Sequence, residues 1–243
     1  MDTGIWATWY DVNDGDREAL HDWMHSTYLP FLKQLPGIAW VAHYEEKGGG
    51  PGMKKLGAQV PRPTEDIGSA TQFVILVGAS TPQVFYRPLI FDVEKKEEFR
   101  DELAKRRGTR SVILSEQTRV NGPSAELRTP GTTPGPAIQM GAFCMATLEQ
   151  EIDLGCWYAQ YRLPFMAQVS SCITARKLIS VSGWAKHSIL YEFTSLEGRM
   201  KDFEDGHEEL ALDPKEWTGR IVQGTIHAPG SPTVGERIWP PLS

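Results

Sequence analysis

The stretch WMHSTYLPF, residues 23–31, returns later in the chain as WYAQYRLPF, residues 157–165. Tryptophan, leucine, proline and phenylalanine recur at the same places, whereas His25 in the first copy is replaced by Ala159 in the second. Around both copies the apolar residues follow the three- and four-residue spacing of an amphipathic helix. We therefore expect the shared residues to build the same helix twice and the unshared polar residues to carry the chemistry that differs.

The repetition extends well beyond this helix, which indicates a duplicated structural unit. Each copy predicts the order β-α-β-β-α-β, the split ferredoxin-like arrangement. In the first copy we expect strands over 5–12, 38–46, 71–79 and 111–120, a helix over 16–35, and a helix over 93–108 that ends at Gly108. The matching segments are 4–12 with 141–149, 69–80 with 184–195, and 118–122 with 226–230.

These units predict an α+β protein made of two tandem ferredoxin-like repeats. Residues 1–122 form the N-terminal repeat, 123–136 are a linker rich in proline and glycine, and 137–243 form the C-terminal repeat with a tail. A four-stranded sheet with helices on one face leaves its other face open, so the two units are expected to pack sheet to sheet as an α/β barrel with helices outside. The long loop 45–68 is expected to be a functional lid or a disordered insertion.

Composition excludes several classes of protein. The net charge of −6 disfavours nucleic-acid binding, and the chain has no apolar stretch long enough to cross a membrane. The first residues lack the basic and apolar regions of a signal peptide, and the three cysteines form no CxxC pair. We expect a reduced, cytoplasmic protein. Its eight tryptophans and seven tyrosines suit either a pocket for flat ligands or a filled core.

With the repeated helix followed by a Pro-Gly turn and a strand, the chain resembles the dimeric α/β-barrel superfamily, particularly its EthD-like branch, here as a fused tandem repeat. The resemblance implies a pocket between the first helix and the sheet of a repeat. It also implies a range of activities: cofactor-free cyclases, dehydratases, decarboxylases, isomerases and monooxygenases, and haem proteins. The chain departs from the EthD-like pattern before Leu-Pro, where relatives carry histidine and this sequence has Tyr28 and Arg162. A histidine base cannot be transferred to that position.

The first copy offers His25 and Tyr28 on one helix and His43 on the next strand as catalytic candidates. Imidazole titrates near neutrality and can take a proton from an acidic C–H or O–H, while a tyrosine hydroxyl can stabilise the developing oxyanion. Surface or core roles remain the alternative for each of them. Trp9, on the preceding strand, is a candidate for contact with a flat substrate.

The second copy offers His187 and Arg162 as catalytic candidates and Arg176, Tyr158 and Tyr161 as substrate-binding candidates. Two guanidinium groups separated by a short turn could both face a carboxylate, and the tyrosines could stack on an aromatic ligand. A surface ion pair for the arginine and a core role for Tyr161 remain alternatives. His227 is expected at a loop or rim.

No metal site is predicted, although His21 and His25 have the i, i+4 spacing of a helical ligand pair without an obvious third ligand. Haem is an alternative that the superfamily allows, with His187 as the best axial candidate. Otherwise no cofactor is expected.

We predict a cofactor-independent lyase or isomerase (a decarboxylase, dehydratase or cyclase) that acts on a small aromatic or polyketide-like acid. A histidine would move the proton, and arginine or tyrosine would stabilise the carboxylate or enolate. Two alternatives remain: a cofactor-free monooxygenase of a quinol or anthrone, and a non-catalytic protein that binds aromatic ligands or haem. A homodimer is possible, and neither a nucleic acid nor a membrane is expected as a partner.

Overall fold

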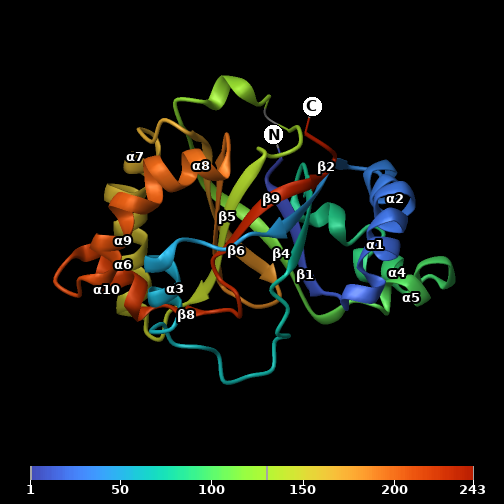
Figure 1. Ribbon diagram of the computed structural model, residues 1–243, viewed down its shortest axis with the longest axis horizontal. Helices are drawn as coiled ribbons and strands as arrows, with labels where there is room; N and C mark the ends of the chain where they lie inside the picture. The colour runs from blue at the N-terminus through green and yellow to red at the C-terminus, as the bar shows by residue number, and fades with distance from the viewer. Residues whose placement is uncertain (1, 130, 243) are drawn as a thin grey trace.

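The computed structural model describes residues 2–129 and 131–242, without the side chains of residues 52, 56 and 207–209. Its centre is a closed antiparallel β-barrel surrounded by helices, so the predicted α+β barrel class is confirmed (Figure 1). The barrel strands are β1 (Gly4–Asp11), β2 (Ile38–Glu46), β3 (Phe73–Ala79), β4 (Arg107–Asn121), β5 (Ala137–Cys144), β6 (Cys172–Ser182), β7 (His187–Phe193) and β9 (Thr233–Trp239).

The barrel strands follow the order β7-β6-β4-β1-β3-β2-β9-β5, and pairing of β5 with β7 closes the circle. The first half (residues 2–122) supplies the run β4-β1-β3-β2, and the second half (residues 137–242) supplies β9-β5-β7-β6. These two four-stranded sheets join at their edges, where β2 pairs with β9 and β4 pairs with β6. The joined edges leave none of these strands unpaired on one side.

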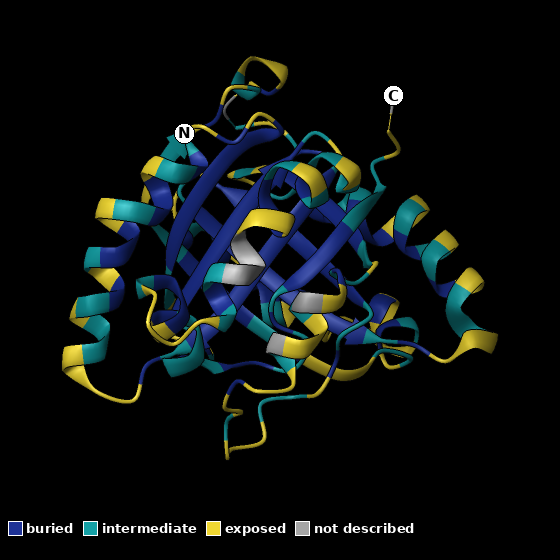
Figure 2. Ribbon diagram, turned by 60° about the vertical axis from the view of Figure 1, so that its left-hand side comes forward, coloured by how far each residue is buried: buried dark blue, intermediate teal, exposed yellow. Residues whose placement is uncertain are grey.

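Apolar side chains from both sheets fill the barrel interior. Ile5, Ala7 and Trp9 of β1 point inward, and Trp6 and Tyr10 point outward toward helices of the first half. This alternation is the two-residue period of a β-strand. Figure 2 shows the resulting continuous band of buried strands beneath helices with exposed outer faces.

The repeated sequence forms the same interrupted helix in both halves. In the first half α1 (Asp14–Trp23) is followed by a π-helical turn η1 (Met24–Tyr28) and then by α2 (Leu29–Gln34). In the second half α6 (Leu148–Trp157), the π-helical turn η4 (Tyr158–Arg162) and α7 (Leu163–Met166) repeat this order. Each π-turn ends just before Leu-Pro, where the proline lacks the N–H of a regular i→i−4 hydrogen bond.

Apart from α3 (Pro51–Gly57), the other helices of each half lie on the outer side of that half's own sheet (Figure 1). The first half contributes η2 (Pro82–Phe85), α4 (Ile90–Glu94) and α5 (Glu97–Leu103), and η3 (Ala125–Leu127) lies in the connection between the halves. The second half contributes α8 (Leu196–Arg199), the π-turn η5 (Met200–Glu204), α9 (Asp205–Leu212), α10 (Trp217–Gly224) and the short strand β8 (Ile226–His227) beside β5.

Three expectations about element boundaries were wrong. The match of 4–12 with 141–149 was wrong, because the first strand of the second half is β5, and the match of 118–122 with 226–230 was wrong, because the fourth strand is β9. In the first half the expected helix 93–108 ends at Leu103, and Gly108 lies in β4 with φ of 57°. Both matches aligned glycines, and a glycine occurs inside a strand, as at Gly4 and Gly141, as well as in a turn.

The loop expected over residues 45–68 contains a helix, α3 (Pro51–Gly57), that crosses to the second half (Figure 1). The backbone N–H of Gly50 donates to the carboxylate of Glu204 on η5, and the guanidinium of Arg62 donates to the carbonyl of Ala228 at 2.7 Å. The first half therefore supplies a cover for helices of the second half.

Within the described residues, no helix combines the length and apolar character that crossing a membrane requires.

Candidate functional site

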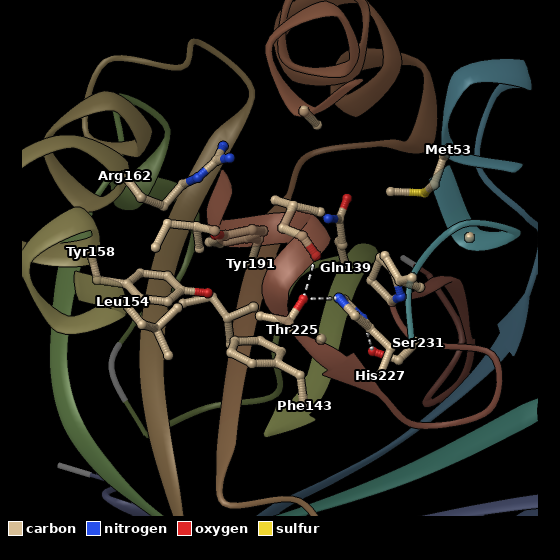
Figure 3. A pocket seen from close by; sticks show the side chains of 18 of the residues that line it. Met53, Gln139, Phe143, Leu154, Tyr158, Arg162, Tyr191, Thr225, His227 and Ser231 are labelled. Atoms are coloured by element: carbon tan, nitrogen blue, oxygen red, sulfur yellow. Dashed lines mark hydrogen bonds between the residues drawn. The ribbon is translucent and has the colours of Figure 1, made fainter. Parts of the chain in front are cut away.

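A cavity of about 80 Å³ lies between the sheet and the helices of the second half (Figure 3). Its walls are mostly apolar and come from β5, β7, α6, η4 and α10, with Met53 of α3 closing one side. A dry apolar cavity of roughly 150 Å³ can hold benzene, so this one takes a small ligand unless the cover moves. The polar side chains in the wall are Gln139, Tyr158, Arg162, Tyr191, Glu204, Thr225, His227 and Ser231.

Strand pairing explains why the second half has this cavity and the first half does not. On β1, Trp6 and Thr8 pair with positions 77 and 75 of β3; on β5, Gln139 and Gly141 pair with positions 191 and 189 of β7. These pairings make Trp6 equivalent to Gln139 and Thr8 equivalent to Gly141. The neighbouring strands agree, since His43 of β2 pairs with position 75 and Lys177 of β6 pairs with position 189. A buried tryptophan and a threonine of the first half are thus replaced by a glutamine and a glycine, which leaves space under the helices.

Arg162 brings a cation to the cavity wall. The side chain is 1% exposed, and its guanidinium carbon lies 4.5 Å from the ring centre of Trp157 and 5.3 Å from that of Phe203. A guanidinium on aromatic faces keeps its N–H donors directed sideways, in the geometry that binds a carboxylate. The π-turn η4 positions this residue, since it is the last residue of that turn.

Two buried tyrosine hydroxyls lie near this cation. Burial raises the pKa of Tyr158, as do the neighbouring Tyr191 and a hydrogen bond to it; burial likewise raises the pKa of Tyr191, to about 12. Both phenols are therefore neutral at physiological pH, and because one of them donates to the other, the pair has one O–H left to donate to a ligand. Such a donor stabilises an oxyanion that forms beside it.

A histidine lies across the cavity from Arg162 (Figure 3). His227 Nε2 is 2.5 Å from Thr225 Oγ1, and Nδ1 is 3.3 Å from Ser231 Oγ. Thr225 donates to the carbonyl of Val222 at 2.6 Å, and Ser231 accepts from the amide of Ala142 at 2.9 Å. One chain of donors satisfies all of these contacts: Ser231 donates to Nδ1, and Nε2–H donates to Thr225.

Burial and the nearby Arg62 lower the pKa of His227 to about 4, so its imidazole is neutral at pH 7. Neutral imidazole can accept a proton, and an anion in the cavity would raise this pKa toward neutrality. His227, expected at a rim, instead forms part of the wall.

His187, the predicted catalytic histidine, lies beside the cavity rather than in its wall. The ring stacks on Phe143 with 6.1 Å between ring centres, and its Nδ1 is 3.2 Å from Lys177 Nζ. Its Nε2 is 3.7 Å from Glu151. Burial and the charge of Lys177 lower the pKa of His187 to about 4.

The structure joins His25 and His43 of the first half: His43 is fully buried, and His25 is half-exposed at a surface hollow that is separate from the cavity. His25 Nε2 lies 2.9 Å from His43 Nδ1, and His43 Nε2 lies 2.9 Å from the hydroxyl of Tyr10. Burial lowers the pKa of both histidines. Tyr28 is fully buried and donates to Glu94 at 3.1 Å, so it belongs to the first-half core rather than to a pocket.

Two predicted substrate-binding residues point into the barrel interior, away from the cavity. Arg176 is fully buried, with Nη1 3.0 Å from Asp2 and Nε 2.7 Å from Glu116. Trp9 donates to Thr233 at 2.9 Å, and Arg110 covers its ring. The expectation that Arg176 joins Arg162 is wrong, because neighbouring residues of a strand face opposite sides of the sheet.

Tyr161 is half-buried, stacks on Phe165 with 6.2 Å between ring centres, and does not line the cavity. Of the predicted residues, only Arg162 and Tyr158 lie in its wall. Sequence reasoning missed Gln139, His227 and Met53. The signal for Gln139 was a polar residue at an outward strand position where the first half has tryptophan, but the incorrect strand match concealed it.

A haem does not fit these residues. The cavity is far smaller than a porphyrin, and both ring nitrogens of His227 are already hydrogen-bonded to hydroxyl groups. His187 is separated from the cavity by Phe143. Among the described residues, no group of three or more His, Cys, Asp or Glu side chains is arranged to hold a metal ion.

Comparison with known proteins identifies solved structures that have a similar fold. The sequence matches no protein-family model and no curated protein. Its structure is similar to that of a presumed monooxygenase from Fusobacterium nucleatum, with a TM-score of 0.55, 6% identity, and coverage of 98% of this chain and 93% of that one.

Two further structures are similar over nearly the whole chain. A presumed chlorite dismutase has a TM-score of 0.55 at 12% identity, with 98% of this chain and 96% of that chain covered. An anthrone oxidase-like protein has a TM-score of 0.55 at 11% identity, with 97% and 90% covered. These likenesses show that the three proteins share the fold of this chain.

Proposed function

We propose that the cavity of the second half is the active site of an enzyme that acts on a small carboxylic acid with an aromatic or polyketide-like skeleton. The reaction is a proton-transfer reaction of the lyase or isomerase type (decarboxylation, dehydration or cyclisation) and needs no bound cofactor. One observation carries the proposal: a mostly apolar cavity has a buried guanidinium on one side and a neutral imidazole on the other.

Arg162 binds the carboxylate, or the enolate that develops from it, in this proposal. An apolar wall excludes water and strengthens the charge-assisted hydrogen bond between guanidinium and oxyanion. The hydrogen-bonded pair of Tyr158 and Tyr191 has one free O–H, which donates to the same region.

His227 accepts the proton. The negative charge of the bound substrate raises its pKa, so the imidazole becomes a better base when the site is filled. Thr225 and Ser231 hold the ring by both nitrogens, and the proton reaches Nδ1 through the hydroxyl of Ser231. A benzoate-sized ligand requires the α3 cover, which carries Met53, to move outward.

Benzoate binding, measured by calorimetry, tests the role of Arg162. We expect Arg162→Gln to weaken binding by roughly 10- to 100-fold, the equivalent of one charge-assisted hydrogen bond, and to leave binding of uncharged benzamide nearly unchanged. Arg220→Gln, which alters an exposed arginine of α10, is the matched control. Equal benzoate affinity in wild type and Arg162→Gln would rule out this anion site.

Exchange of the carbon-bound hydrogens of phenylpyruvate for solvent deuterium tests the base. We expect His227→Gln, which keeps a hydrogen-bonding side chain but does not titrate, to slow the catalysed exchange by on the order of 100-fold or more. The folded state is checked by its unfolding transition. Exchange that is as fast in this variant as in wild type would exclude His227 as the base.

A cofactor-free monooxygenase is the second candidate, favoured by the fold shared with the presumed monooxygenase and the anthrone oxidase-like protein. Consumption of dioxygen in the presence of anthrone separates it from the first candidate. Benzoate binding without exchange or oxygen uptake would identify a non-catalytic binding protein.

We also infer that the two halves descend from a duplicated EthD-like unit. The matching strand orders and the two π-turns before Leu-Pro support this origin.

A further inference from the structure

A buried lysine lies directly behind the wall of the cavity. Lys177 is 5% exposed and leaves β6 on the face that carries the helices, paired across the sheet with Ile189, a residue of the cavity wall. Its Nζ lies 5.4 Å from the ring centre of Tyr158, which also lines the cavity. It is the positional equivalent of His43 in the first half.

The surroundings of Lys177 do not compensate a charge. Its Nζ donates to the carbonyl of Leu178 at 2.9 Å and lies 3.2 Å from His187 Nδ1. Among the described residues, no carboxylate lies within ion-pair distance of this amine, although a lysine is rarely so buried without a partner. Burial lowers the pKa of Lys177 to about 7. About half of the amine is therefore uncharged at neutral pH, and an uncharged amine is nucleophilic.

We propose that Lys177 is a nucleophilic residue that forms an imine with the ketone carbon of a β-keto acid bound in the cavity. The proposal rests on the function proposed above and names its substrate class. The ring of Tyr158 separates Nζ from the cavity, so the carbonyl group reaches the amine when this ring turns aside.

The reaction balances without a further reactant. Nζ adds to the ketone carbon and loses a proton, which His187 Nδ1 is placed to receive, and water leaves as the iminium forms. The bond to the carboxylate carbon then breaks, its electron pair moves toward the iminium nitrogen, and carbon dioxide departs. Protonation of the enamine carbon and addition of water release the shortened ketone and the free amine. One proton is consumed for each carbon dioxide released.

Reductive trapping tests this proposal. Wild-type protein is incubated at pH 7 with acetoacetate and sodium cyanoborohydride, and the modified peptide is identified by mass spectrometry. We expect one adduct per chain on the peptide that contains Lys177. An ordinary lysine is uncharged at this pH roughly a thousand times less often, so exposed lysines should react far more slowly.

Variants identify the reacting amine. Lys177→Met removes it while keeping an unbranched apolar side chain, and Lys177→Arg keeps a cation that cannot form an imine; both should lose the adduct and release of carbon dioxide from acetoacetate. Lys186→Met is the matched control, because Lys186 is a nearby lysine that is half-exposed and paired with Glu151, and it should trap as wild type does. A comparable adduct in Lys177→Met, or one spread over surface lysines, would overturn the proposal.

The outcome is separable from the test of Arg162. Benzoate binding with no adduct at Lys177 would reject only the imine. An adduct at Lys177 together with unchanged benzoate affinity in Arg162→Gln would reject only the anion site.

Discussion

The two halves of the barrel share a strand order and an interrupted helix, yet one encloses packed side chains and the other a cavity. Where the first half has Trp6 and Thr8 under its helices, the second has Gln139 and Gly141. The two halves therefore share the arrangement of strands and helices although the side chains between helix and sheet differ. Two substitutions on one strand account for much of the difference.

The two halves also carry different residues at equivalent, paired strand positions. The first half has Tyr10, His43 and Phe73 on three adjacent strands, and the second has Phe143, Lys177 and His187 at the paired positions. In the first half the polar groups satisfy one another in a chain of hydrogen bonds. In the second half Lys177 and His187 contact each other behind the cavity wall, where Tyr158 and Phe143 separate them from the open space.

The largest expected effect comes from opening the first half. Trp6→Ala removes a fully buried indole and should lower the free energy of unfolding by about 3–5 kcal/mol. The new cavity should bind indole, which would restore part of the lost stability. Urea denaturation with and without indole measures both effects, and Trp6→Phe is the conservative control. A loss below about 1 kcal/mol would mean that the first half collapses around the missing ring.

Filling the second half should abolish binding with a smaller effect on folding. Gln139→Trp gives this strand the residue of the first half and should weaken benzoate binding at least tenfold, because the ring occupies the cavity. Gln139→Met is the matched control: it loses the same 2.9 Å hydrogen bond from Arg199 without filling the space. Equal weakening in both variants would assign the effect to the lost hydrogen bond rather than to volume.

The smallest expected effect concerns the dependence of stability on pH. Burial lowers the pKa of His25 below its usual value near 6.5, so the unfolded chain binds a proton at this residue more readily than the folded one. The stabilising contribution is complete above pH 6.5 and is lost as the pH falls through the folded-state pKa.

His25→Ala, which installs the residue of the second half, should therefore flatten the fall in unfolding free energy below pH 6.5. The slope of unfolding free energy against pH should change by less than about 1.4 kcal/mol per pH unit, which is the limit for one proton. The change stays below this limit because the ring is half-exposed. Denaturant unfolding between pH 8 and pH 4 measures the slope. A steeper slope in the variant would contradict the direction of the pKa shift.

The sequence predicted the barrel class and the repeated helix because apolar periodicity and the Leu-Pro phrase are local signals. It predicted Arg162 and Tyr158 at the site because they replace other residues within that phrase. It could not predict which face of the sheet carries Arg176. A shift of one residue along a strand moves a side chain from the face toward the cavity to the face toward the barrel interior. The role of His227 could not be predicted either, because its position depends on where the last strand begins. The match of 118–122 with 226–230 placed that strand too early in the chain.

Helix α3 belongs to the first half by sequence and to the second half by location. Under the proposed function, the selectivity of the cavity is therefore divided between two distant parts of the gene. Exchanging residues 47–72 between related chains would transplant part of the binding surface without altering a single residue of the half that contains Arg162 and His227. Under the proposed function, sequence changes in the first half would in this way change which ligand the cavity of the second half accepts.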